Sequence, residues 1–187
     1  MRIIIAAIVG GIVMFVWGAA SHMLTPIGEM GLKTTPNEAP IVSALQSNLN
    51  EPGFYFIPGM DMHKEVSAEE QAAWTARYEK GPNAIVIYQP TGETPMSPKQ
   101  LGTEFISNIL AALVVALLMT WTVGSFAKRV AMATLVGLTA WLSIDVSYWN
   151  WYHFPIGMIT GELLEQVIGW LLTGFVMAFI LRNRTLV

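Results

Sequence analysis

Four long apolar stretches constrain the fold of this chain more than any other feature. They cover residues 1–22, 101–127, 130–153 and 156–181. Each is long enough to cross the roughly 30 Å hydrocarbon core of a bilayer, which takes about 20 helical residues. The chain is 53% hydrophobic and only 12% charged, whereas a soluble domain has about 25% charged residues. The sequence therefore predicts an all-α membrane bundle of four transmembrane helices.

The basic residues that flank these stretches predict the orientation in the membrane. They lie at the start of the first stretch, between the second and the third, and after the fourth: Arg2, Lys128, Arg129, Arg182 and Arg184. No acidic residue shares these three locations, so the positive-inside rule places all of them in the cytoplasm. We therefore expect cytoplasmic termini, with residues 182–187 as a cytoplasmic tail. Residues 23–100 are then extracytoplasmic, and the expected location is a bacterial inner membrane.

Other sequence features narrow the class of protein. Gly18-Ala19-Ala20 is a tolerable signal-peptidase site, but the apolar run is too long for a signal peptide and its flank has a single Arg. Residues 1–22 are therefore predicted to be an uncleaved signal anchor. The chain has no Cys, which excludes disulfides and thiol chemistry. It also lacks a P-loop, a dinucleotide-binding fingerprint, a nucleophile elbow and a basic patch suited to nucleic acid.

Residues 23–100 are predicted to form a small α+β insertion between the first two membrane helices. The pattern predicts helices over residues 38–48 and 68–80 and strands over residues 54–57 and 84–88. Ser67 and Glu70 have the spacing of a capping box at the start of the second of these helices. Nine acidic and five basic residues give the insertion a net charge of −4, which is typical of a solvated surface.

Polar residues recur at helical spacing in all four apolar stretches, toward the predicted extracytoplasmic side. Lipid tails cannot hydrogen-bond to them, so we expect the polar faces to turn toward one another or toward a partner. The polar faces end half-way across the membrane, which favours a pocket open to the extracytoplasmic side over a continuous conduit. The predicted pocket consists of His22, Glu104, Ser107, Asn108, Asp145, Tyr152, His153, Glu162, Glu165 and Gln166.

Two groups of residues have the chemistry of metal ligands. Imidazole and carboxylate groups in the predicted pocket could bind a hard metal ion through His22, Asp145, His153 and Glu165. In the insertion, thioether and imidazole groups that suit Cu(I) occur close together at Met60, Met62 and His63. No Glu-x-x-His pair, which di-iron bundles use, occurs on one helix.

Two further motifs lie around the fourth stretch. The aromatic residues 148–154 are typical of a belt at the membrane surface. Gly157 and Gly161 form a Gly-x-x-x-Gly motif, which permits close helix approach within the bundle or across a dimer.

The absence of a recognised catalytic motif favours a non-catalytic accessory or assembly subunit of a larger membrane complex. Its expected partners are the lipid bilayer and other membrane subunits or a second copy, with no nucleic acid. The alternative is a metal-binding membrane protein or metalloenzyme that uses the polar pocket or the segment Met60-Asp61-Met62-His63. A purely structural polar network, a proton or small-cation path and an acid–base enzyme also fit the residues, so enzymatic activity stays open.

Overall fold

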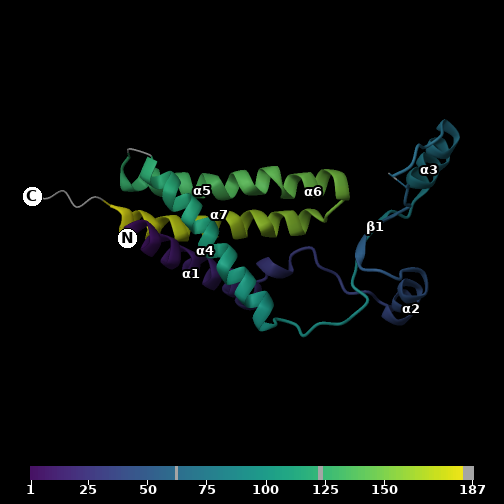
Figure 1. Cartoon of the computed structure of the whole chain (residues 1–187), viewed down its shortest axis with the longest axis horizontal. Coiled ribbons are helices and arrows are strands. Elements are labelled where there is room, and N and C mark those ends of the chain that lie inside the picture. The colour runs from purple at the N-terminus through teal and green to yellow at the C-terminus, as the bar shows by residue number, and fades with distance from the viewer. Residues whose placement is uncertain (62, 122–123, 183–187) are drawn as a thin grey trace, which may run out of the picture. The chain divides into compact units, whose positions relative to one another are not determined.

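The computed structural model is mostly helical and contains one small sheet (Figure 1). It describes residues 1–61, 63–121 and 124–182. Within these residues four helical segments are long and apolar enough to cross a membrane, as the sequence predicts. The chain divides into two compact units, one formed by residues 1–33 with the chain from Pro95 onward and the other by Thr34–Thr94.

The helical unit contains all four candidate membrane spans. The first span is α1 and the second is α4. The third consists of α5 followed by α6, and the fourth is α7. Their bounds are α1 Arg2–Leu24, α4 Pro98–Trp121, α5 Phe126–Ser143, α6 Asp145–Tyr152 and α7 Ile156–Leu181. A short 3₁₀ helix, η1, covers Ile27–Glu29 directly after α1.

The third span differs from the single helix expected over residues 130–153, because it is interrupted at Ile144 between α5 and α6. The hydroxyl of Ser143 donates hydrogen bonds to the carbonyls of Thr139 and Ala140, at 2.8 and 3.2 Å. Ser147 donates in the same way to the carbonyl of Ser143 at 3.3 Å. Hydroxyls that bond back to the preceding turn bend helices, and these two serines flank the interruption.

The second span begins at Pro98, three residues before the expected boundary at Leu101. The backbone N–H of Ser97 donates to the side-chain oxygen of Gln100 at 2.9 Å, and the N–H of Gln100 donates to the Ser97 hydroxyl at 3.3 Å. This reciprocal pair is a capping box, and proline is favoured directly after such an N-cap. The helix ends at Trp121, short of the expected boundary at residue 127.

The spans pack side by side in the order α4, α1, α7, α5, and α4 makes few contacts with α5 and α7. Each neighbouring pair is antiparallel. The first helix fits between two others because Gly10 and Gly11 leave room for them. A Cβ added to Gly10 would lie 2.6 Å from the sulfur of Met177 in α7, and one added to Gly11 would lie 2.6 Å from the Cα of Ile109 in α4. Small residues permit this close approach of helices.

The buried core of the helical unit lies toward one end of the spans. It combines the start of α1, the end of α4, the start of α5 and the end of α7, with small side chains prominent among them: Ala6, Ala112, Val115, Ala116, Met119, Ala133, Trp170, Met177 and Leu181. Figure 1 shows α4 crossing the other spans obliquely, whereas α5 and α7 run nearly side by side. The buried contacts of α4 therefore lie in the half of this helix that ends at Trp121.

The Gly-x-x-x-Gly motif contacts a backbone segment rather than another membrane helix. A Cβ added to Gly161 would lie 2.8 Å from the carbonyl oxygen of Ile27, and one added to Gly157 would lie 3.0 Å from the backbone nitrogen of Gly31. The motif therefore lets η1 and the residues after it lie directly on α7.

The unit Thr34–Thr94 is a small α+β fold. Its elements are α2 Glu38–Asn48, β1 Gly53–Ile57, α3 Ala68–Lys80 and β2 Ala84–Tyr88. The strands pair antiparallel, with Phe54 opposite Ile87 and Phe56 opposite Ile85. The two helices and two strands are those that the sequence predicts. None of the described residues of this unit is buried, so it has little core of its own.

The predicted capping box at the start of α3 is confirmed. The N–H of Glu70 donates to the Ser67 hydroxyl at 3.2 Å, and the N–H of Ser67 donates to the Glu70 carboxylate at 3.0 Å. The hydrogen bond from the Ser67 backbone, followed by that from Lys64, lowers the pKa of Glu70. Asn37 occupies the N-cap position of α2, but its side chain makes no capping hydrogen bond.

Candidate functional site

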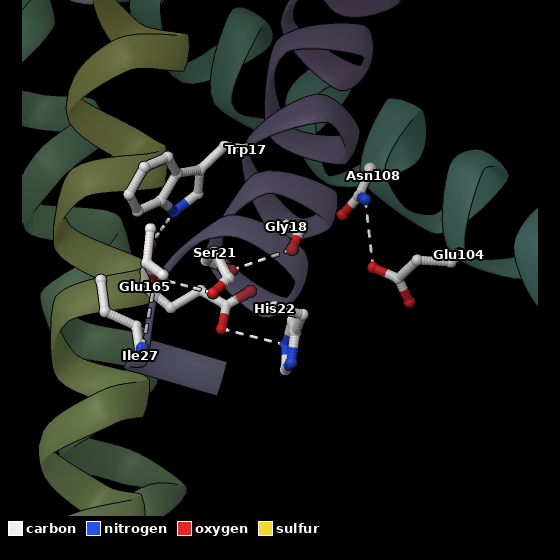
Figure 2. Close-up of polar contacts among 9 residues, drawn as sticks. Trp17, Gly18, Ser21, His22, Ile27, Glu104, Asn108 and Glu165 are labelled. Atoms are coloured by element: carbon white, nitrogen blue, oxygen red, sulfur yellow. Dashed lines mark hydrogen bonds and ion pairs between the residues drawn. The ribbon is translucent and has the colours of Figure 1, made fainter. Parts of the chain in front are cut away.

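An imidazole–carboxylate pair joins the end of α1 to the middle of α7. Nε2 of His22 lies 3.3 Å from Oε2 of Glu165. The Glu165 side chain is 18% exposed and that of His22 is 56% exposed, so the carboxylate is the more enclosed partner. Figure 2 shows the two side chains pointing toward each other. Nε2 can donate to the carboxylate in either charge state of the imidazole, and protonation adds an ion pair.

Two contacts fix the distance between α1 and α7 at this level. The indole Nε1 of Trp17 donates to the backbone carbonyl of Glu165 at 3.0 Å. Gly18 leaves room for the carboxylate, since an added Cβ would lie 3.6 Å from Oε1 of Glu165. The backbone and the side chain of Glu165 are therefore both held by α1.

The turn after α1 holds the other side of His22. The buried Ser21 hydroxyl donates to the Gly18 carbonyl at 2.9 Å, and the Thr25 hydroxyl donates to the Ser21 carbonyl at 2.7 Å. Thr25 also accepts a hydrogen bond from the backbone N–H of Ile27 at 3.2 Å, which sets the start of η1. This brings Gly28 against the imidazole so closely that a Cβ there would overlap His22.

A second polar pair lies on α4. Nδ2 of Asn108 donates to Oε1 of Glu104 at 3.1 Å, and the hydroxyl of Ser107 donates to the Glu104 carbonyl at 2.9 Å. The first contact joins residues four positions apart on one helix face, as the spacing predicts. Within the described part of the chain, Glu104 forms no ion pair.

A cavity of about 380 Å³ lies between these two polar pairs. It is bounded by α1, α4 and α7 and by Met96 before α4. The lining is mainly apolar, apart from the two polar pairs and one glutamine: Met14, Phe15, Gly18, Ala19, His22, Met23, Met96, Leu101, Glu104, Asn108, Glu165 and Gln166. Five of the ten residues predicted for the polar pocket line this cavity, namely His22, Glu104, Asn108, Glu165 and Gln166.

The other five predicted pocket residues do not line the cavity. Ser107 bonds to its own helix. Glu162 lies one turn from Glu165 on α7 and is within electrostatic range of Glu165, Asp145 and His22. Asp145 is the first residue of α6. Tyr152 and His153 lie at the end of α6 and directly after it, where the ring of Tyr152 packs against Tyr148 with centroids 5.8 Å apart.

His153 lies in the connection between α6 and α7. It ends α6 in the left-handed conformation, with φ 58° and ψ 31°, and its N–H bonds to the Tyr148 carbonyl. Together with Pro155 it turns the chain into α7. The residue therefore lies in the connection between two helices rather than among the residues that line the cavity.

The structure gives no support to the predicted metal sites. Among the residues whose placement is described, no three His, Asp or Glu side chains lie close enough together to hold a metal ion. In the Met60 segment, the Asp61 carboxylate instead accepts the backbone N–H of His63 at 2.9 Å. Met62, the other predicted copper ligand, lies outside the described residues.

Sequence patterns left several contributors to the site unassigned. Trp17 and Gly28 act through contacts with other segments, which helical spacing does not reveal. The turn at Thr25 could have been predicted from the sequence, because a Thr-Pro pair after an apolar run is typical of a helix end followed by a turn.

Comparisons of the chain with protein-family models, curated proteins and solved structures gave no match. The function is therefore inferred from the geometry of the cavity and the residues around it.

Proposed function

We propose that the protein is an integral protein of a bacterial inner membrane that serves as a non-catalytic accessory or assembly subunit of a larger complex. In this proposal the cavity between α1, α4 and α7 receives a polar or cationic side chain from another membrane subunit. The observation that carries the proposal is the presence of two carboxylates in a mainly apolar cavity with few donors around them.

The carboxylates of Glu104 and Glu165 each accept fewer hydrogen bonds than they have acceptor sites. An ionised carboxylate has about four acceptor sites. The described side chains supply one donor to Glu165, from His22, and one to Glu104, from Asn108. Lipid tails supply none, and carboxylates within a membrane are paired or occupy a polar site. A Lys, Arg or amide side chain from a partner helix would supply the missing donors.

The proposed orientation places both termini in the cytoplasm and residues 23–100 outside it. Its support is the grouping of basic residues at one end of the spans. Arg2 donates to the Arg182 carbonyl at 3.4 Å, and Arg129 donates to the Leu181 carbonyl at 2.6 Å. The positive-inside rule assigns such an end to the cytoplasm.

The orientation can be tested with single cysteines, because the chain has none of its own. Gly92→Cys lies in open space, and Lys128→Cys lies at the start of α5. A membrane-impermeant maleimide added to intact spheroplasts should label the first and should label the second only after lysis. Labelling of Lys128→Cys in intact spheroplasts would reverse the orientation.

The partner can be tested by photo-crosslinking in cells, followed by purification in mild detergent. A photoreactive residue at Ala19 lines the cavity, whereas one at Leu135, which is 59% exposed on α5, is the matched control. We expect Ala19 to give one recurrent protein adduct. That adduct should be lost in the double variant Glu104→Gln, Glu165→Gln and kept in Glu69→Gln.

Three results would contradict the proposal. They are an adduct that does not depend on the two carboxylates, crosslinking at Ala19 only to lipid or to a second copy, and isolation of the protein from mild detergent as a stable monomer without another subunit.

A further inference from the structure

Three guanidinium groups converge on the last residues of α7. Nη1 of Arg129, at the start of α5, donates to the carbonyl of Leu181 at 2.6 Å. Nη1 of Arg2, at the start of α1, lies 3.4 Å from the carbonyl of Arg182. Leu181 and Arg182 are consecutive, so both guanidinium groups lie beside neighbouring peptide carbonyls. The guanidinium of Arg182 itself lies 4.0 Å above the ring of Phe179.

No carboxylate balances this group among the described residues. The acidic residues of the helical unit occur in η1, near the start of α4, at the start of α6 and in the first half of α7: Glu29, Glu104, Asp145, Glu162 and Glu165. The ion pairs among the residues that the structure describes are elsewhere. The carbonyls at the end of α7 supply only about half an elementary charge. The three arginines therefore form a cationic cluster that no described carboxylate neutralises, and Lys128 precedes Arg129 in the chain.

The cluster has unused donors. Nε of Arg129 is buried and has no hydrogen-bond partner in the part of the chain that the structure describes. Arg2, Lys128 and Arg182 are exposed. The guanidinium fork matches phosphate oxygens in a bidentate manner, and each charge-assisted bond is stronger than a neutral one.

An apolar surface lies beside the cluster on α7. Phe175 is 57% exposed and Phe179 is 52% exposed, one helical turn apart. Phe126 packs edge-on against Phe175 with centroids 5.1 Å apart. In a bilayer, the ends of the spans lie at the depth of the headgroup phosphates and the rings lie at the depth of the acyl chains. Cations next to exposed apolar rings fit an amphiphile with an anionic head.

We propose that Arg2, Lys128, Arg129 and Arg182 bind the headgroup phosphate of an anionic phospholipid whose acyl chains lie along Phe175 and Phe179. The inference requires the membrane location but is independent of the cavity and its partner. Basic pockets between membrane helices are a recurring way of binding anionic lipid headgroups.

The test uses the full-length protein in mild detergent and native mass spectrometry of bound lipid. The probes are phosphatidylglycerol and phosphatidylcholine with identical acyl chains. The wild type should retain phosphatidylglycerol at least tenfold more strongly. Arg2→Gln and Arg182→Gln should each weaken binding about fivefold, since one cation near an anionic lipid contributes about that factor. Arg182→Lys should retain most of the phosphatidylglycerol binding of the wild type, and Arg77→Gln on α3 is the matched control.

Each outcome decides the proposal. Equal retention of the two lipids by the wild type would overturn it, as would equal losses in Arg77→Gln and Arg182→Gln. Displacement of phosphatidylglycerol by inorganic phosphate at equal concentration would assign the site to free phosphate instead of lipid. If a substitution of arginine lowers the helix content, the exposed Lys128→Gln replaces it and should show the same fivefold loss.

Discussion

Gly28→Ala tests whether η1 holds the imidazole of the candidate site. An added Cβ would lie 2.6 Å from Cγ and 2.7 Å from Cα of His22, and still closer to Nδ1. Since a backbone atom is among those overlapped, rotation of the imidazole alone cannot relieve the contact. Either η1 must move away from α1 or His22 must lose its 3.3 Å contact with Glu165. Overpacking of this kind costs about 1–3 kcal/mol of unfolding free energy.

The free energy of unfolding can be measured by titration with SDS in mixed micelles, with helix content as the signal. Gly92→Ala is the control, because an added Cβ there meets no atom within 4 Å, and it should stay within about 0.5 kcal/mol of the wild type. Both variants reduce the entropy of the unfolded chain to a similar extent, so their difference isolates the steric term.

The second measurement is the imidazole nitrogen spectrum of the three histidines. In Gly28→Ala the signals of His22 should shift, while those of His63 and His153 should not. Equal stability of Gly28→Ala and the control, with unchanged His22 signals, would refute the contact between η1 and the imidazole.

Three other predictions follow from contacts described above. Gly11→Ala should lower the unfolding free energy by about 1–3 kcal/mol in the same SDS titration because α4 would be forced from α1, whereas Gly102→Ala, with open space around it, should not. Trp17→Phe removes the indole donor between α1 and α7 and should cost about 0.5–1.5 kcal/mol in that titration, whereas Trp151→Phe, at a 72% exposed position, should be nearly neutral. Hydrogen bonds lower the pKa of Glu70 from its ordinary value of 4.5. The stabilisation of α3 by the ionised Glu70 is therefore present above pH 4.5 and is lost as the pH falls through the lowered pKa. Amide exchange in the first turn of α3 should show this pH dependence, and Glu70→Gln should abolish it.

The contrary results are equally specific for these three predictions. Equal stability of the two glycine variants would mean that α1 and α4 are farther apart than described. Equal effects of the two tryptophan substitutions would exclude a specific role for the indole hydrogen bond. An unchanged pH dependence in Glu70→Gln, which retains the capping geometry, would assign the titration to another group.

Much of the fold could be predicted because local signals agree with it. The fourth span begins after Pro155 and ends before Arg182 in the structure, as the apolar pattern indicates. The start of helix α3 follows from its capping box, and the helix ends at Lys80 with Gly81 as its C-cap. The interruption at Ile144 was not predicted, because hydropathy does not register hydroxyls that bond back to the preceding turn.

The site could be predicted only in part, for a physical reason. Helical spacing shows which side of a helix Glu165 or Asn108 occupies, but it does not show which helix lies beside it. That neighbour depends on where small residues such as Gly10 and Gly11 allow close approach. Two predicted pocket residues of the third span, Tyr152 and His153, are therefore separated from the cavity, although their position along the span resembles that of His22.

The side-by-side order of the spans has a consequence for biosynthesis. The helix α1 lies between α4 and α7, so its two neighbours are the second and the fourth of the four spans along the chain. It ends at Leu24 and α7 ends at Leu181, a gap of roughly 160 residues that takes about 8–30 s at a translation rate of about 5–20 residues per second. Until α7 is made, the α7-facing side of α1 has no final neighbour, and neither has the side of α5 that packs against α7. Assembly of the helical unit therefore ends with the insertion of α7, and a ribosome that stops before this helix leaves α5 without the span it packs against.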